Sequence, residues 1–211
     1  MTKEQINIVV CGIGGQGVVL AARIIAEAAL AEGLKVVTAD VPPISQRFAP
    51  TMSFVRIGEG VYSETVPEGE ADLMIAFEPL QALRQGIAFA SENGIVLLNT
   101  RPIDLRPNPS IKYLALEEIL EYFEKMGVKN VKCFDASDVA IQKTGSILAL
   151  NMVMLGAAHA TDILGVQEKS IEKVIKRVSP KGAIDANLTA FKAGIDIGAR
   201  NLIPTVSSGK V

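Results

Sequence analysis

The sequence predicts an α/β fold, with a mostly parallel, doubly wound sheet, a small antiparallel excursion and a C-terminal helical cap. Short apolar runs rich in β-branched residues alternate with helical segments up to about residue 135, and only helical segments follow. The hydrophobic content of 49% is mainly aliphatic, since aromatic residues make up only 5%. Aliphatic strands are typical of a sheet covered on both faces. The length of 211 residues fits one domain.

The first strand, helix and second strand form one unit. Residues 6–10 (INIVV) are a run of β-branched residues broken only by Asn7, typical of a strand buried on both faces. After a glycine-rich loop, residues 18–32 have a helical pattern, and Gly33 is the expected C-terminal stop. Residues 35–39 form the next strand. We expect the two strands to run parallel with a right-handed crossover, as in Rossmann-like domains.

The segment after this unit predicts the antiparallel excursion. Pro42 and Pro43 break the strand pattern. Residues 51–57 alternate apolar and polar side chains, and residues 58–60 (GEG) form a turn signal. Residues 61–66 are therefore expected to pair back on residues 51–57 as a hairpin.

Strands and helices then alternate to about residue 135. Further strands are predicted at 72–77, 95–99 and 131–135, with a weaker candidate at 111–114. Helices are predicted at 80–90, 116–126, 137–144, 146–164, 170–178 and 186–198. Ser137 is a good capping residue for the helix that begins there. We place one domain at residues 1–200 and a loose tail at 201–211.

Charge and rare residue types exclude several functions. The net charge of −2 gives no positive field that would attract nucleic acid. Cys11 and Cys133 are the only cysteines, so the chain alone cannot provide four thiolates for an iron–sulfur cluster or a structural zinc site. His159, the only histidine, lies in an apolar helical stretch with no partner at a suggestive spacing. We assign no catalytic residue and no metal ligand.

The sequence also predicts a cytoplasmic protein without a membrane anchor. Its start lacks the basic region, apolar run and cleavage site of a signal peptide. The apolar stretches 18–31 and 146–160 contain polar residues and are shorter than the roughly 20 residues of a membrane span. Two unclustered cysteines provide no disulfide framework, which agrees with a reducing compartment.

The glycine-rich loop is the main candidate for a binding site. Gly12, Gly14 and Gly17 match the G-x-G-x-x-G spacing, with Gly15 and Gln16 between them. The first glycine allows a tight turn, the second a close backbone approach to a phosphate, and the third close packing of helix and strand. Free N–H groups at the start of the helix would add an anion site. We therefore predict that these five residues contact a cofactor.

Three interpretations of this loop remain open from the residues alone. Asp40 ends the second strand, where a carboxylate would hold the ribose of NAD in a free-standing NAD(P)- or FAD-binding oxidoreductase. Pro42 and Pro43 follow it at once, and no hydride-transfer acid or base stands out elsewhere. The glycines could instead serve only a close strand-to-helix turn, or belong to a nucleotide-binding scaffold without chemistry.

Five parts of the chain together carry a family resemblance. They are GIGGQGV at 12–18, SQR at 45–47 with VRIG at 55–58, GEAD at 69–72 with EPLQALR at 78–84, NMVMLG at 151–156, and NLTAFKAG at 187–194. The chain thereby resembles the gamma-type subunit of 2-oxoacid:ferredoxin oxidoreductases, in particular the beta subunit of indolepyruvate ferredoxin oxidoreductase. One departure is that Phe48, Ala49 and Pro50 follow Gln46-Arg47, where the family has two glycines. This loop should be stiffer and more apolar.

The resemblance implies one subunit of a complex that decarboxylates a 2-oxoacid, indolepyruvate or another aryl 2-oxoacid. The acyl group passes to coenzyme A and the electrons pass to ferredoxin. It implies that thiamine diphosphate and the iron–sulfur clusters are held by a large (alpha) partner subunit in a hetero-oligomer, and that the isolated chain is inactive. The gamma-type domain is associated with coenzyme A access. This agrees with the two cysteines, which leave the redox cofactors to another chain.

Several polar residues follow predicted strands, at the sheet edge where ligands of open α/β sheets bind. Gln46 and Arg47 lie in the loop after the second strand, and the Arg47 guanidinium is suited to a carboxylate or phosphate. We therefore add both residues to the predicted cofactor contacts. Glu78 is either a polar contact in the cleft or a carboxylate at a helix start. Arg101 is either a phosphate contact or a surface residue. Cys11 is expected to be an inert buried thiol.

Overall fold

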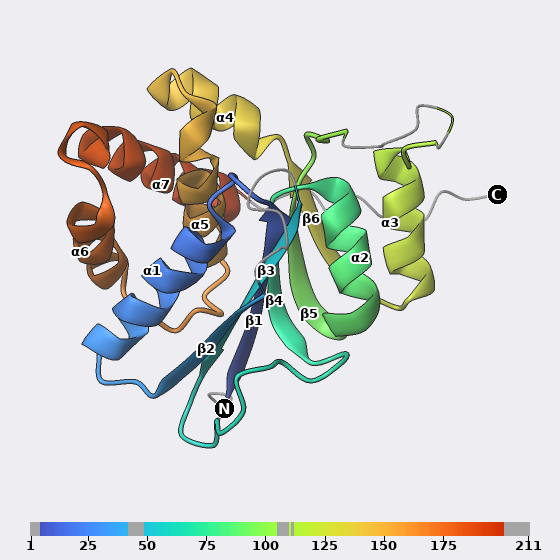
Figure 1. Ribbon diagram of the computed structural model, residues 1–211, viewed down its shortest axis with the longest axis horizontal. Coiled ribbons are helices and arrows are strands. Elements are labelled where there is room, and N and C mark those ends of the chain that lie inside the picture. Colours follow the sequence, from blue (N-terminus) through green and yellow to red (C-terminus); the bar gives the residue numbers. More distant parts are fainter. Residues whose placement is uncertain (1–4, 42–48, 105–109, 111, 201–211) are drawn as a thin grey trace.

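The computed structural model describes residues 5–41, 49–104, 110 and 112–200. In these ranges, a mixed sheet is flanked by helices on both faces (Figure 1). The strands are β1 (Ile6–Ile13), β2 (Val36–Val41), β3 (Pro50–Ile57), β4 (Ala71–Ala76), β5 (Ala90–Asn99) and β6 (Asn130–Phe134). The α-helices are α1 (Val18–Ala31), α2 (Pro79–Phe89), α3 (Leu116–Lys125), α4 (Ala136–Thr144), α5 (Leu150–His159), α6 (Glu168–Val178) and α7 (Ile184–Ala199). Two 3-10 turns, η1 (Ile147–Ala149) and η2 (Lys181–Ala183), precede α5 and α7.

The sheet has the strand order β2-β3-β1-β4-β5-β6. The pairs β1–β4, β4–β5 and β5–β6 are parallel, whereas β3 is antiparallel to both of its neighbours, β1 and β2. In the centre of the sheet, Val9 lies between Phe54 of β3 and Met74 of β4. β1 is buried from its second residue onward because helices cover both of its faces. The predicted doubly wound α/β fold is confirmed.

The sequence did not predict which strand lies beside the first one. β1 and β2 run in the same direction, as expected, but they do not pair, because β3 lies between them. β3 has a buried side chain on each face of the sheet, as at Phe54 and Val55, so it is stable in an interior position and not at an edge.

The predicted hairpin of residues 51–57 with residues 61–66 is wrong. Both edges of β3 are already occupied by β1 and β2, and residues 61–66 form no strand. The buried guanidinium of Arg56 holds this segment instead, since its Nη1 donates to the carbonyls of Ser63 (3.0 Å) and Thr65 (3.1 Å). Those carbonyls are therefore satisfied without a strand partner.

A single long helix is predicted at 146–164, but the helical segment found there is shorter. It consists of η1 and α5, and α5 ends at His159. Directly after it, the Thr161 hydroxyl donates to the carbonyl of Ala158 at 2.7 Å, and Asp162 adopts a left-handed backbone with φ of 60°. Both features turn the chain away from the helix axis.

Two smaller predictions differ in detail. The cap of α4 is Asp135, whose side chain accepts from the amide of Asp138 at 2.7 Å, and Ser137 lies inside the helix. The weak strand candidate at 111–114 forms no strand at residues 112–114, and residue 111 lies outside the described residues. The remaining predicted strands and helices are found with boundary shifts of a few residues.

The C-terminal helices α4 to α7 form the predicted cap. Together with α1, they form a layer on one face of the sheet, while α2 and α3 cover the other face (Figure 1). α5 is buried along its length up to Ala158. It packs against α7 at glycines: a Cβ on Gly194 would lie 2.8 Å from the carbonyl carbon of Val153, and one on Gly156 2.8 Å from the amide nitrogen of Ile195. The predicted tail at 201–211 lies outside the described residues.

Candidate functional site

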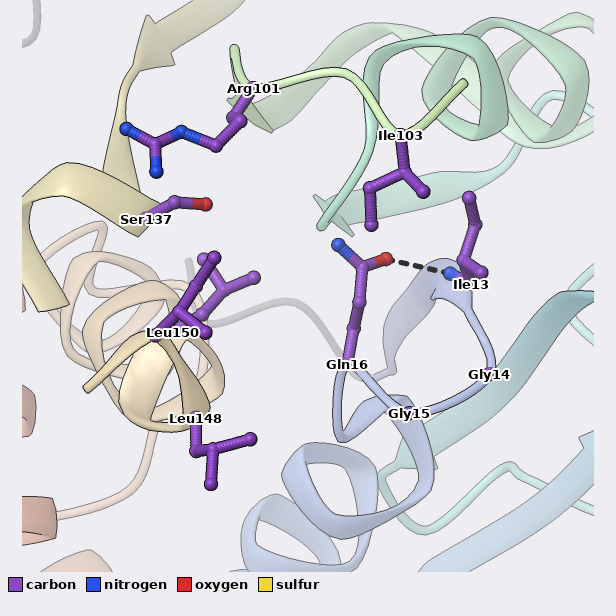
Figure 2. Close-up of a pocket in the computed structure, with 10 residues that line it drawn as sticks. Ile13, Gly14, Gly15, Gln16, Arg101, Ile103, Ser137, Leu148 and Leu150 are labelled. Atoms are coloured by element: carbon purple, nitrogen blue, oxygen red, sulfur yellow. Dashed lines mark hydrogen bonds between the residues drawn. The ribbon is translucent and has the colours of Figure 1, made fainter. Parts of the chain in front are cut away.

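A cavity of about 330 Å³ lies at the carboxyl ends of the parallel strands (Figure 2). α1 leaves β1 toward one face of the sheet and α2 leaves β4 toward the other (Figure 1), so the chain diverges between these two adjacent strands. Such a divergence forms a crevice where ligands of open α/β sheets bind. The residues that line the cavity are Ile13, Gly14, Gly15, Gln16, Arg101, Ile103, Ser137, Ile147, Leu148 and Leu150.

The glycine loop forms one wall of this cavity. Gly15 and Gly17 have left-handed backbones with φ of 102° and 85°, which glycine adopts without strain. Gly17 also begins α1, and a Cβ there would lie 2.9 Å from Cγ of Asn151. A Cβ on Gly12 would lie 2.8 Å from Oε1 of Gln16. Gly12 and Gly17 are therefore needed for packing, whereas a Cβ on Gly15 would meet open space.

Gln16 fixes the conformation of the loop. Its Oε1 accepts from the amide of Ile13 at 2.7 Å, and its Nε2 donates to the carbonyl of Phe77, just after β4, at 2.9 Å. The amides of Gly14 and Gln16 donate to the carbonyls of Ala49 and Ile13. Three of the loop's amides are thus already bonded within the protein, so a ligand would meet mainly Gly15 and the first turn of α1.

A hydrogen-bond network joins the ends of the parallel strands beneath the cavity. The carbonyl of Phe77 also accepts from Nδ2 of Asn99 at 3.0 Å. Nδ2 of Asn99 lies 3.1 Å from Oγ of Ser137, whose amide donates to Oδ1 of Asn99 at 3.3 Å. Gln16, Asn99 and Ser137 are therefore held in place by one another. Sequence reasoning missed Asn99 as a site residue and treated Ser137 only as a cap, although both are polar residues next to apolar strands.

The rest of the cavity lining is mainly apolar, and its one charged side chain, Arg101, is paired with Asp135. Leu148 and Leu150 face Ile103 and Gln16 across the cavity (Figure 2). Leu148 is 80% exposed at the mouth. Arg101 donates to the carboxylate of Asp135 at 3.0 Å, so the guanidinium charge is largely balanced. The cavity thus offers an apolar surface with a few neutral polar groups and little net charge.

Glu78 lies just beyond β4 and is fully buried. Its Oε2 accepts from the amide of Gln81 at 2.8 Å, which confirms the interpretation of a helix-start carboxylate. Burial and the nearby Glu78 carboxylate raise the pKa of the Tyr113 hydroxyl and of the Cys11 thiol. Both groups stay protonated near neutral pH, which agrees with the expectation of an inert Cys11.

The other candidates from the sequence lie away from the cavity or outside the description. Asp40 sits on β2 and accepts from the hydroxyl of Ser53 at 2.6 Å. Because β3 separates β2 from β1, two strand spacings of together about 10 Å lie between Asp40 and the strand of the glycine loop. His159 lines a second cavity near Asp162, not the one described above. Gln46 and Arg47 lie outside the described residues.

Within the described ranges, no three His, Cys, Asp or Glu side chains come close enough together to hold a metal ion. Cys11 and Cys133 lie on β1 and β6, which are separated by β4 and β5. Two separate thiols do not fit a cluster that needs four thiolates. No helix in this part of the chain is both long and apolar enough to cross a membrane.

Comparison with known proteins decides the family. A family model described as pyruvate ferredoxin/flavodoxin oxidoreductase matches residues 7–197. The chain belongs to this family. It is 40% identical over 198 residues to "Indolepyruvate oxidoreductase subunit IorB" of Methanothermobacter thermautotrophicus, covering 92% of this chain and 98% of that protein. It is 30% identical over 166 residues to "Pyruvate/ketoisovalerate oxidoreductases common subunit gamma" of Pyrococcus abyssi, covering 78% and 82%.

A solved structure of this family shares the fold. Pyruvate oxidoreductase subunit PORC of Thermotoga maritima superposes with a TM-score of 0.69 at 28% identity, over 92% of this chain and 97% of that one. The family resemblance inferred from the five segments is therefore confirmed. The two relatives named above are subunits of oxidoreductases.

Proposed function

We propose that this chain is the gamma-type (beta) subunit of a 2-oxoacid:ferredoxin oxidoreductase that acts on indolepyruvate or another aryl 2-oxoacid. The match to an indolepyruvate oxidoreductase subunit at 40% identity, over nearly the full length of both chains, carries this proposal. The pyruvate/ketoisovalerate relative is less similar, at 30%, and is covered over less of its length.

In the proposed reaction, a 2-oxoacid loses its carboxyl group as CO₂ and its acyl carbon forms a thioester with coenzyme A. The two electrons released reduce two one-electron ferredoxin acceptors, and one proton leaves. We place thiamine diphosphate and the iron–sulfur clusters in a large (alpha) partner subunit. Two cysteines on separate strands support this division, since they cannot ligate a four-thiolate cluster. The complex would be cytoplasmic.

The part of this chain that would meet coenzyme A is the cavity at the glycine loop. Its volume is near the lower end of the roughly 300–1,000 Å³ range of small-molecule sites, so it fits one portion of that coenzyme and not the whole. Apolar walls, the open Gly15 and the first turn of α1 suit such a portion. Of the contacts predicted from the sequence, Gly14, Gly15 and Gln16 line the cavity, and the geometry adds Ser137. Gly12 and Gly17 shape the same loop and stay proposed contacts, as do Gln46 and Arg47, which lie outside the described residues.

The test is co-expression of this chain with a thiamine- and cysteine-rich partner encoded nearby, followed by an assay of ferredoxin reduction over a panel of 2-oxoacids. We expect the chain alone to be colourless and inactive, and the purified complex to prefer aryl substrates and to require coenzyme A. If no such partner binds, the subunit proposal fails. If the complex prefers pyruvate, the aryl assignment fails.

Replacing Gly14 tests the loop within the same assay. Gly14→Val adds a branched side chain beside the cavity, so we expect activity of the complex to fall while the fold is mostly kept. Gly182→Val in η2 is the control, because a Cβ at Gly182 meets nothing within 4 Å. Full activity of the Gly14→Val complex would remove the glycine loop from the proposed site.

A free-standing NAD(P)- or FAD-binding oxidoreductase is the alternative that the G-x-G-x-x-G spacing favours. The position of β3 between β1 and β2 weighs against it, because Asp40 is displaced from the loop. Calorimetry of the isolated chain with NADH, NADPH and FAD separates the two proposals. Tight binding that Gly14→Val abolishes would favour the alternative.

A further inference from the structure

The two carboxylate oxygens of Glu78 accept hydrogen bonds from different parts of the fold. Oε2 caps α2 by accepting from the amide of Gln81. Oε1 accepts from the amide of Ile103 at 3.4 Å and from the hydroxyl of Tyr113. Ile103 lies after β5 and Tyr113 lies before α3, so a single oxygen fixes two points of the β5–α3 connection.

Capping alone does not explain a glutamate at this position. The shorter side chains of Ser, Asp and Asn are the usual caps, and a fully buried carboxylate carries a desolvation cost that must be offset by hydrogen bonds. In the described part of the chain, no Lys or Arg pairs with Glu78. Among the described residues, three groups donate to Glu78, and two of them belong to the β5–α3 connection.

The connection that Glu78 holds is part of the cavity. Ile103 lies beside the side chain of Gln16, on the side of the cavity that faces Leu148 and Leu150 (Figure 2). Tyr113 stays protonated because burial and Glu78 raise its pKa, so it remains a donor near neutral pH. A fixed Ile103 sets the width of the cavity on this side, since it is the apolar residue of that connection in the lining.

We propose that Glu78 is a positioning residue that, through Ile103 and Tyr113, holds one wall of the cavity at the width its ligand needs. The inference rests on the proposed function only for the identity of that ligand, coenzyme A. Glu78 itself does not line the cavity. Its effect is therefore expected on ligand affinity and not on turnover.

Two substitutions separate the positioning role from the capping role. Glu78→Asp keeps a carboxylate that can cap α2 but shortens its reach toward Ile103 and Tyr113. Tyr113→Phe leaves Glu78 intact and removes only one donor. Tyr122→Phe is the matched control, since Tyr122 is a partly exposed residue on α3.

The experiment uses the purified complex for kinetics and the full-length chain for amide hydrogen exchange. We expect Glu78→Asp and Tyr113→Phe to raise the KM for coenzyme A about three- to tenfold with little change in kcat. In Glu78→Asp, we expect exchange of the Ile103 amide to rise at least about tenfold, while the Gln81 amide keeps its protection. Tyr122→Phe should match the wild type in both measurements.

Unchanged exchange at the Ile103 amide in Glu78→Asp would overturn the positioning role. Raised exchange at Ile103 with an unchanged KM would overturn the link between this wall and the ligand. If the wild-type complex does not use coenzyme A at all, the proposed function fails. The exchange data still decide whether Glu78 holds Ile103.

Discussion

The side-chain amide of Gln16 joins the glycine loop to the end of β4, with Nε2 of Gln16 2.9 Å from the carbonyl oxygen of Phe77. Oε1 of the same amide accepts from Ile13 at 2.7 Å. A side chain therefore fixes the conformation of the loop through two hydrogen bonds. A loop that is fixed in this way lowers the conformational cost of binding.

Replacement of Gln16 should release this loop. In Gln16→Ala, the amide of Ile13 loses its acceptor and the carbonyl of Phe77 loses one of its two side-chain donors. We expect the free energy of unfolding to fall by about 1–3 kcal/mol, measured by urea denaturation. Gln142→Ala on the exposed surface of α4 should change it by less than about 0.5 kcal/mol. Equal effects of the two substitutions would contradict this prediction.

A comparison of Gly17 with Gly33 tests why the loop needs a glycine at position 17. The reason is either the left-handed backbone alone or also the lack of room for a Cβ atom. Both have left-handed backbones, with φ of 85° and 81°. Alanine at either position costs about 1–2 kcal/mol for that conformation. A Cβ at Gly17 would also press on the side chain of Asn151, whereas one at Gly33 meets nothing within 4 Å. We expect Gly17→Ala to lower the free energy of unfolding by at least about 1 kcal/mol more than Gly33→Ala. Thermal and urea unfolding measure this difference, which would vanish if Asn151 moved freely.

The close contact of α5 and α7 should tolerate no side chain at Gly194. A Cβ there would lie 2.8 Å from the carbonyl carbon of Val153 and 3.0 Å from the amide nitrogen of Ala157, so backbone would have to move. Gly194→Ala should therefore lower the free energy of unfolding by about 3 kcal/mol. Gly182→Ala, in open space on η2, is the control and should be nearly neutral. A neutral Gly194→Ala would mean that the two helices can separate without cost.

The ion pairs of Glu27 predict a pH-dependent contribution to stability. Hydrogen bonds from Arg23, and then from Arg177 of α6, lower the pKa of Glu27 below its ordinary value. A lowered folded-state pKa gives stability that is present above the unfolded pKa and is lost as the pH falls through the folded pKa. Because the pair is on the surface, Arg177→Ala should cost about 0.2–1 kcal/mol at neutral pH.

That cost should shrink in acid, as the pH falls through the lowered folded-state pKa of Glu27 and the carboxylate becomes protonated. It should also shrink in about 1 M salt, where surface charges are screened. Urea unfolding at each pH and salt concentration measures it. Lys176→Ala, exposed on the same helix, is the control. A cost for Arg177→Ala that is the same in acid as at neutral pH would show that Arg177 acts through packing and not through its charge.

Most individual elements could be predicted from the sequence because their signals are local. Residues 6–10 are β-branched apart from Asn7, which predicts a buried strand, and the glycines that follow predict a tight turn into a helix. The glycine loop, whose residues the sequence predicts as cofactor contacts, forms one wall of the cavity, and that binding role stays a prediction. The hairpin prediction at 61–66 failed, because an alternating pattern shows that a segment can pair but not which strand it pairs with.

The sequence by itself determined the class of fold and the family, and its two cysteines are too few for a four-thiolate cluster. The tertiary structure decided the strand order, which displaced Asp40 from the glycine loop. It also decided the partners of Glu78, one of which, Tyr113, lies 35 positions away along the chain. The physical reason is that propensity, periodicity and glycine geometry act over a few neighbouring residues. Strand order and buried hydrogen bonds instead depend on how distant segments fill one core.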